Sequence, residues 1–132
     1  MFASNATLLL RRILAFDATV SLATGVLCLA GADVLHQWLA LPVPVLRLSG
    51  VFLIVCAGFI GWLASRQQPP RALVWIVIAG NALWAIESVV SLWSGWLQPN
   101  TLGAAFVIVQ ALTVAGIAEL EYIALSRQPV TV

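Results

Sequence analysis

Four long apolar stretches, separated by short segments that contain proline, dominate the pattern of hydrophobic and polar positions along the chain. A helix needs about 20 apolar residues to cross the hydrocarbon core of a bilayer. A continuous helix cannot pass through the intervening prolines, which are Pro42, Pro44, Pro69, Pro70 and Pro99. The pattern therefore predicts an all-α, four-helix transmembrane bundle with spans at about residues 13–32, 46–65, 72–97 and 102–125.

Composition supports this prediction and makes residues 1–132 a single membrane domain. Hydrophobic residues form 62% of the chain and charged residues 8%, whereas about a quarter of a soluble domain is charged. Residues 1–32 have some features of a secretory signal, but Asp17 interrupts the apolar core, so we expect a retained first span. The net charge of +1 gives no reason to expect a nucleic-acid partner.

The arginines predict how the bundle sits in the membrane. With four crossings, both termini and the segment around Pro69 share one side, which carries Arg11, Arg12, Arg66, Arg71 and Arg127. The other side carries only Arg47. Positive charge marks the cytoplasmic side, so we expect both termini in the cytoplasm of a bacterial cell, with the bundle in its cytoplasmic membrane. Residues 33–41 predict a short amphipathic segment in the outer loop between the first two spans.

A carboxyl group within an apolar span is the strongest functional signal in the sequence. Glu87 is the only charged residue between Ala72 and Leu97, and a charge at the bilayer centre costs about 3 kcal/mol even on the mildest scales. Because burial disfavours the charged form, we expect Glu87 to be protonated and neutral at rest. We predict a ligand- or proton-binding role, and the alternative is a structural hydrogen bond to Gln110 or to a serine.

Other polar or aromatic residues within the spans complete a predicted ligand-binding set, which is Glu87, Trp84, Gln110, Asn81 and Asp17. A helix rises about 1.5 Å per residue, so depth in the membrane follows from position in the span. By this measure an outer polar layer contains Thr24, Cys56, Glu87 and Gln110. An inner polar layer contains Asp17, Asn81 and Glu119.

Three- and four-residue steps place many of these residues on single helix faces. One predicted polar face contains Asp17, Ser21, Thr24 and Cys28, and another contains Trp84, Glu87, Ser91 and Ser94. We expect both faces to point into the bundle, because a carboxyl facing lipid would lack hydrogen-bond partners. The second span carries small residues at four-residue steps, Ala57, Gly61 and Ser65, a spacing typical of close helix contacts.

The polar residues also have structural interpretations. Asp17 lies near the cytoplasmic arginines and is expected to pair with one of them. Asn81 and Gln110 suit hydrogen bonds between helices. For Glu119 and Glu121 we expect a structural role near the cytoplasmic interface, where charge costs little.

The sequence predicts no cofactor and no metal site. His36 is the only histidine, so it cannot supply paired axial ligands to haem, and the outer loop offers a metal little beyond Asp33. Cys28 and Cys56 differ in depth by about 10 Å, which is too far for a disulfide and excludes a membrane dithiol oxidoreductase.

The segment from Asn81 to Ser88 (NALWAIES), together with Leu46 to Gly50 (LRLSG), resembles a family of small four-helix bacterial integral membrane proteins of unknown function. The resemblance covers most of the chain and implies the four-helix fold, but no activity. Length and span count are also similar to those of the small multidrug-resistance transporters, where Asp17 would match the carboxylate of the first span. The surrounding motif of that family is absent, so this second comparison is one of scale only.

These features favour a protein that binds or transports a small apolar or cationic ligand within the lipid bilayer, with proton linkage through Glu87. A transport path through so small a bundle would need a homodimer. The alternative is an accessory or assembly subunit of a larger membrane complex, in which the polar residues lock the bundle and the small-residue face of the second span docks the partner. An enzyme that acts on a lipid or quinone through Asp17 or Glu119 has the least support, so we do not expect an enzyme.

Overall fold

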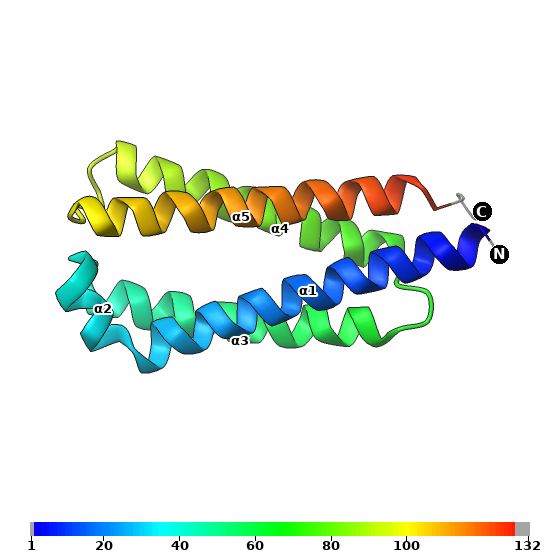
Figure 1. Cartoon of the computed structure of the whole chain (residues 1–132), viewed down its shortest axis with the longest axis horizontal. Coiled ribbons are helices and arrows are strands. Elements are labelled where there is room, and N and C mark those ends of the chain that lie inside the picture. Colours follow the sequence, from blue (N-terminus) through cyan, green and yellow to red (C-terminus); the bar gives the residue numbers. More distant parts are fainter. Residues whose placement is uncertain (1, 129–132) are drawn as a thin grey trace.

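The computed structural model describes residues 2–128, with side chains from residue 5 onward, and every element in this range is helical. The helices are α1 (Phe2–Ala30), α2 (Ala32–Leu39), α3 (Val43–Ser65), α4 (Arg71–Trp93) and α5 (Thr101–Ser126). Figure 1 shows α1, α3, α4 and α5 lying side by side as a bundle. All four are long and apolar enough to cross a membrane, which confirms the prediction of a multi-pass helical membrane protein.

Local sequence explains where the helices begin and end. Pro42 and Pro70 directly precede α3 and α4, where the missing N–H of proline costs nothing. The side chain of Asn100 caps α5 by accepting a 2.8 Å hydrogen bond from the Gly103 N–H. Gly95, with φ of +80°, turns the chain after α4, so residues 94–97 form a loop and not the last turn of the predicted third span. The first helix also starts well before the predicted boundary.

The long helices form two antiparallel hairpins. One hairpin is α1 with α3, and the other is α4 with α5. We call the end of the bundle with Phe2 and Ser126 the terminal end, and the end with α2 and the α4–α5 turn the loop end (Figure 1). In Figure 1 the two hairpins approach each other at the terminal end and lie further apart towards the loop end.

Two glycines hold the α1–α3 hairpin together at close range. A Cβ added at Gly50 would lie 2.7 Å from the Gly25 carbonyl oxygen and 2.7 Å from the Leu29 nitrogen. Only a residue without a side chain allows the two backbones to approach this closely. Of the small residues predicted to form a contact face on α3, Gly61 faces α1, since an added Cβ would lie 3.8 Å from that of Ala18. Ala57 is buried and Ser65 is exposed.

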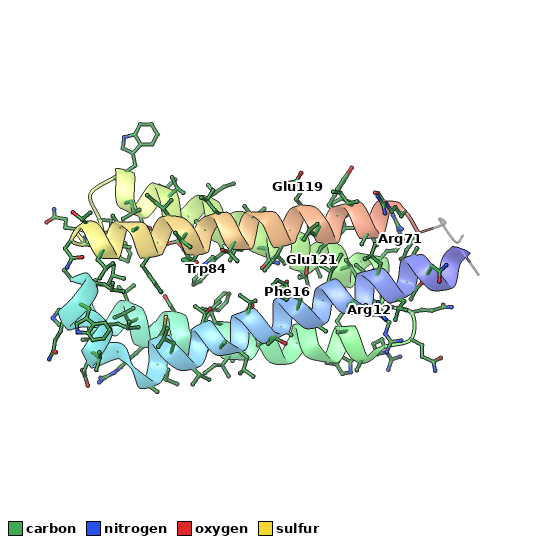
Figure 2. The ribbon with its side chains drawn as sticks, viewed as in Figure 1. Arg12, Phe16, Arg71, Trp84, Glu119 and Glu121 are labelled. Carbon is green, nitrogen blue, oxygen red and sulfur yellow. The ribbon has the colours of Figure 1, made fainter. Side chains whose placement is uncertain are left out.

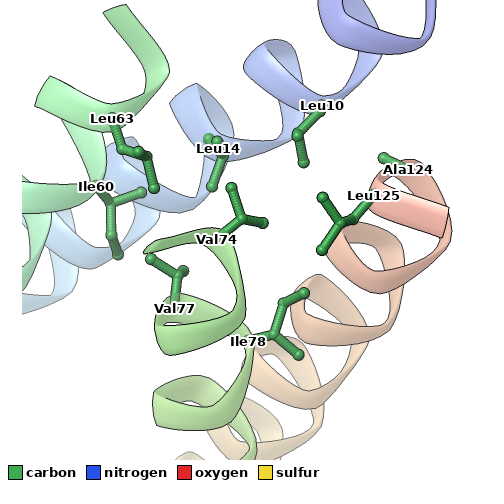
Figure 3. Packing of buried hydrophobic residues seen from close by; sticks show 9 residues of the cluster. All are labelled: Leu10, Leu14, Ile60, Leu63, Val74, Val77, Ile78, Ala124 and Leu125. Atoms are coloured by element: carbon green, nitrogen blue, oxygen red, sulfur yellow. The ribbon is translucent and has the colours of Figure 1, made fainter. Parts of the chain in front are cut away.

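A dry apolar core joins all four long helices near the terminal end (Figure 3). We call this group the terminal core; it contains Leu10, Leu14, Ile60, Leu63, Val74, Val77, Ile78, Ala124 and Leu125. Two arginine side chains bond to the backbone of helix ends near this core. Arg11 Nε donates to the Ala64 carbonyl at 3.0 Å, and an Arg71 guanidinium nitrogen donates to the Leu125 carbonyl at 3.2 Å. Both carbonyls lie in the last turn of a helix, where arginine side chains can bond to the end of the helix.

A second apolar group, the loop-end cluster, covers the opposite end of the bundle. It contains Cys28, Ala32, Leu35, Leu39, Leu41, Leu46, Leu97 and Val107. Helix α2 contributes Ala32, Leu35 and Leu39 to this cluster. It is also bonded to the N-terminus of α5, since Asn100 Nδ2 donates to the Trp38 carbonyl at 2.9 Å. The sequence predicted an amphipathic segment here, and the structure contains a short helix with three buried apolar side chains on one face, Ala32, Leu35 and Leu39.

Candidate binding cavity

A cavity with two lobes lies between the hairpins, in the part of the bundle nearer the loop end. The larger lobe, about 520 Å³, lies mainly between α1 and α5, and the smaller, about 260 Å³, lies mainly between α3 and α4. The lobes share a wall formed by Thr24, Leu53, Trp84, Phe106 and Gln110. Side chains of all four long helices therefore surround one internal space.

The cavity opens sideways and is closed at both ends. Towards the terminal end, the terminal core fills the space between the helices. Towards the loop end, side chains of the loop-end cluster line the cavity and close it. Three lining side chains of the larger lobe are exposed on the flank of the bundle, Leu27, Leu102 and Val109. In a bilayer this flank faces the acyl chains, so the opening leads to lipid.

Trp84 lies at the centre of the cavity and connects three helices. Its ring stacks on Phe52 of α3 at a centroid distance of 5.7 Å and an interplanar angle of 8°. Its Nε1 donates to Gln110 Oε1 of α5 at 2.9 Å, and Gln110 Nε2 donates to Ser88 Oγ at 3.0 Å. Figure 2 shows Trp84 on the side of α4 that faces the other hairpin. The structure thus brings together Trp84 and Gln110, two of the predicted ligand-binding residues.

Glu87 takes a different position from the one predicted. Its side chain is exposed at the edge of the smaller lobe, and its Oε1 accepts a 3.1 Å hydrogen bond from Ser91 Oγ. Gln110 and Thr24 line the same lobe but do not bond to Glu87, and Cys56 lines neither lobe. The expectation that Glu87 points into the bundle is wrong, because Ser88 and Ser91 occupy the buried face of α4. Glu87 lies at the opening.

A second polar group lies deeper, next to the terminal core. Asn81 Nδ2 donates to Asp17 Oδ2 at 2.8 Å and to Glu121 Oε1 at 2.9 Å, and Ser21 Oγ donates to Asp17 Oδ1 at 3.3 Å. Asp17 is 3% exposed and Glu121 is completely buried. The two predicted residues Asp17 and Asn81 therefore lie together, away from Trp84, and a third residue joins them.

The expected partner of Asp17 is also different. An arginine was expected, but the one ion pair among residues 2–128 joins Arg47 to Asp33 at 3.5 Å, on the surface of the loop end. Arg11 and Arg71 bond to helix carbonyls, and Arg66 lies over the Trp62 ring. The partners of Asp17 are the uncharged Ser21 and Asn81.

Glu121 was the functional candidate that sequence reasoning missed. Depth alone placed Glu119 in the inner polar layer, yet Glu119 is exposed and points away from the bundle, while Glu121 points towards α1 (Figure 2). The rotational position of Glu121 around the helix axis, relative to Gln110, could have identified it from the sequence. Gln110 and Glu121 are separated by about three complete turns at 3.6 residues per turn, so they share one face of α5.

Comparison of the chain with protein-family models, curated proteins and solved structures finds no match. The resemblance of the segment from Asn81 to Ser88 to a family of small membrane proteins therefore contributes nothing further to the assignment. The functional argument rests on the cavity and on the side chains around it.

Proposed function

We propose that this protein resides in the bacterial cytoplasmic membrane, with its terminal end facing the cytoplasm, and binds or transports a small apolar or cationic ligand. The observation that carries the proposal is the cavity between the hairpins, which is closed towards both ends of the bundle and open along its flank. A ligand that reaches such a site must first dissolve in the bilayer. Its main body is therefore apolar.

The lining of the cavity favours a ligand with an aromatic or cationic group. Leucine, valine and phenylalanine side chains form most of the wall, and Trp84 presents an indole ring at the junction of the lobes. Indole rings attract cations that approach within about 6 Å of the ring centre. Glu87, at the edge of the smaller lobe, places a carboxyl group where the cationic end of a bound ligand would lie.

Proton linkage follows from the setting of Glu87. Without a ligand, its carboxyl has one hydrogen bond, from Ser91, and no cationic partner among the described residues. A carboxyl in a membrane interior is cheaper to keep neutral than to ionise. A cation bound beside Glu87 would supply the partner that its carboxylate lacks, which is the basis of the proton linkage in this proposal.

Two probes of the same shape test this proposal directly. Benzyltrimethylammonium carries a positive charge, and neopentylbenzene is its neutral carbon analogue. We expect the protein, reconstituted in lipid nanodiscs, to bind the cation at least about tenfold more tightly, which corresponds to about 1.4 kcal/mol. In Glu87→Gln the two affinities should become similar, and proton release on binding the cation should disappear. Equal affinities of the unaltered protein for both probes would contradict a cation site.

A pair of variants on α5 separates the cavity from the rest of the bundle surface. Ala105 lines the larger lobe, while Ala115 is exposed and lines neither lobe. Ala105→Phe should occupy the lobe and reduce binding of both probes at least tenfold. Ala115→Phe adds the same side chain on the lipid-facing surface and should leave binding unchanged. If both variants bind normally, the ligand does not enter the cavity.

The alternative role as an accessory subunit of a larger complex has less support. That role combined polar residues that lock the bundle with the small-residue face of α3 as a docking surface. Polar bonds do join the helices, from Asn81 to Asp17 and Glu121 and from Trp84 to Gln110. Of the docking face, however, Ala57 is buried and Gly61 lies near Ala18 of α1, which leaves only Ser65 exposed.

A further inference from the structure

Asp17 and Glu121 bring two carboxyl groups to one point inside the bundle, on different helices and away from the cavity centre. Both groups bond to the same amide nitrogen, Asn81 Nδ2, at 2.8 and 2.9 Å. Two negative charges this close repel each other, and burial disfavours each of them further. A pair of this kind is stable only when one of the groups is protonated or when a cation neutralises it.

The hydrogen bonds distinguish the two carboxyl groups. Asp17 accepts bonds at both of its oxygens, from Asn81 and from Ser21, and such an arrangement favours an anion. Glu121 accepts only at Oε1, and its Oε2 is completely buried without any hydrogen-bond partner among the described residues. A buried oxygen without a donor is unfavourable for a carboxylate, whereas a protonated Oε2 is an O–H that can donate to the neighbouring Asp17 carboxylate.

Asn81 favours a proton over a metal cation at this site. Its amide turns the NH₂ group towards both carboxyl groups, whereas a bound cation would require the amide oxygen to face them. Asp17 also lies close enough to the Cys56 thiol of α3 to interact with it electrostatically, and α4 contributes the uncharged Asn81. Arg11 and Arg71 bond to helix carbonyls near the terminal end, and Arg47 pairs with Asp33 at the loop end.

We propose that Asp17 and Glu121 form a proton-sharing pair, in which Glu121 Oε2 holds a single proton and Asp17 carries the remaining negative charge. Asp17 borders the larger lobe of the cavity, but Glu121 lines neither lobe and has the terminal core on its other side. Asp17 is therefore the member of the pair that lies nearer the cavity. This site is distinct from Glu87 and does not depend on the ligand proposed above.

Infrared difference spectroscopy of the purified protein without ligand tests the pair. A protonated carboxyl has a C=O stretching band that a carboxylate lacks, so the unaltered protein should show such a band at neutral pH. Because a neutral Glu87 would add a band of its own, the variants are compared in a Glu87→Gln background. There Glu121→Gln should remove the remaining acid band, while Asp17→Asn should shift it and leave Glu121 protonated. Glu119→Gln, an exposed position two residues away on the same helix, is the matched control and should change nothing. A band that is unaffected by Glu121→Gln would overturn the assignment.

A second measurement keeps the native pair intact and does not require Glu121→Gln to fold. Glu87, Glu119 and Glu121 are the only glutamates in the chain, and the first two are exposed. In the double variant Glu87→Gln, Glu119→Gln, carboxyl ¹³C-labelling of glutamate should shift one acid band, because Glu121 is then the only glutamate. If labelling shifts no acid C=O band, Glu121 is ionised. Loss of the shifted band on addition of sodium would show that the pair binds a metal cation and would likewise overturn the proposal.

Discussion

The two halves of the bundle are built in opposite ways. Near the terminal end, all four long helices meet in the terminal core, where Leu10, Leu14, Leu63 and Val74 are fully buried (Figure 3). Towards the loop end each hairpin remains tightly packed internally, but a cavity separates one hairpin from the other. Helices in a membrane associate through packing rather than through exclusion of water. The terminal half therefore joins the hairpins through a continuous apolar core, whereas the loop half joins them around a cavity, through the loop-end cluster and the Asn100 bond to Trp38.

The largest effect is expected where the α1 and α3 backbones touch. Gly50→Leu would force a side chain into the Gly25 carbonyl and the Leu29 backbone, and we expect a loss of at least about 3 kcal/mol in the free energy of unfolding, at the upper end for overpacking. Gly58 lies on the same helix with nothing within 4 Å of an added Cβ, so Gly58→Leu should be neutral. Reversible unfolding in mixed micelles measures both. Similar stabilities would mean that α1 and α3 do not cross at these glycines.

A matched pair of leucine truncations on α3 compares the two halves directly. Leu63 is fully buried in the terminal core, whereas Leu53 already borders both lobes of the cavity. Leu63→Ala creates a new void and should reduce stability by about 2–4 kcal/mol. Leu53→Ala only enlarges an existing space, so we expect a loss below about 1 kcal/mol. A larger loss for Leu53→Ala would show that the loop half is as tightly packed as the terminal half.

The sequence was sufficient to predict those features that are set within a single helix and do not require knowing how the helices pack. Apolar length and proline positions were sufficient for four helices, and the Asp17, Ser21, Thr24 face of α1 does border the cavity. The sequence also placed Trp84 and Gln110 in one predicted ligand-binding set, and the two side chains do bond to each other.

The errors arose where the rotation of a helix about its own axis decides which side chain is buried. From Trp84, both Glu87 and Ser88 lie about one turn away, so the sequence alone could not select which of them is buried. Packing against α5 selects Ser88, through its bond to Gln110, and leaves Glu87 at the opening. Glu121 was assigned to the interface by its distance from the chain end, although its phase relative to Gln110 was available.

A smaller effect is expected from the hydrogen bond between Trp84 and Gln110, which joins α4 to α5 across the cavity wall. Trp84→Phe, Gln110→Met and the double variant form a double-mutant cycle. Such bonds between membrane helices contribute on average about 0.6 kcal/mol, and we expect a coupling energy of this size. Thr113 and Leu83 lie on the same two helices, and the Thr113 hydroxyl bonds within α5 to the Val109 carbonyl, so Thr113→Val with Leu83→Ala should give no coupling. A coupling of zero for Trp84 and Gln110 would show that the bond adds nothing to the loop half.

The smallest change in stability is expected at Glu87. Its carboxyl is exposed at the cavity edge and has one hydrogen bond, from Ser91, and the amide oxygen of glutamine can accept the same bond. If Glu87 is neutral at rest, Glu87→Gln replaces one uncharged polar group by another, and the free energy of unfolding should change by less than about 0.5 kcal/mol.

The same variant is expected to lose the preference for benzyltrimethylammonium over neopentylbenzene. Unfolding in mixed micelles at neutral pH checks the first expectation, with Glu119→Gln as the control for an exposed glutamate. A loss of 2 kcal/mol or more, about the cost of breaking a buried polar network, would mean that Glu87 holds the bundle together and that the cavity edge is structural.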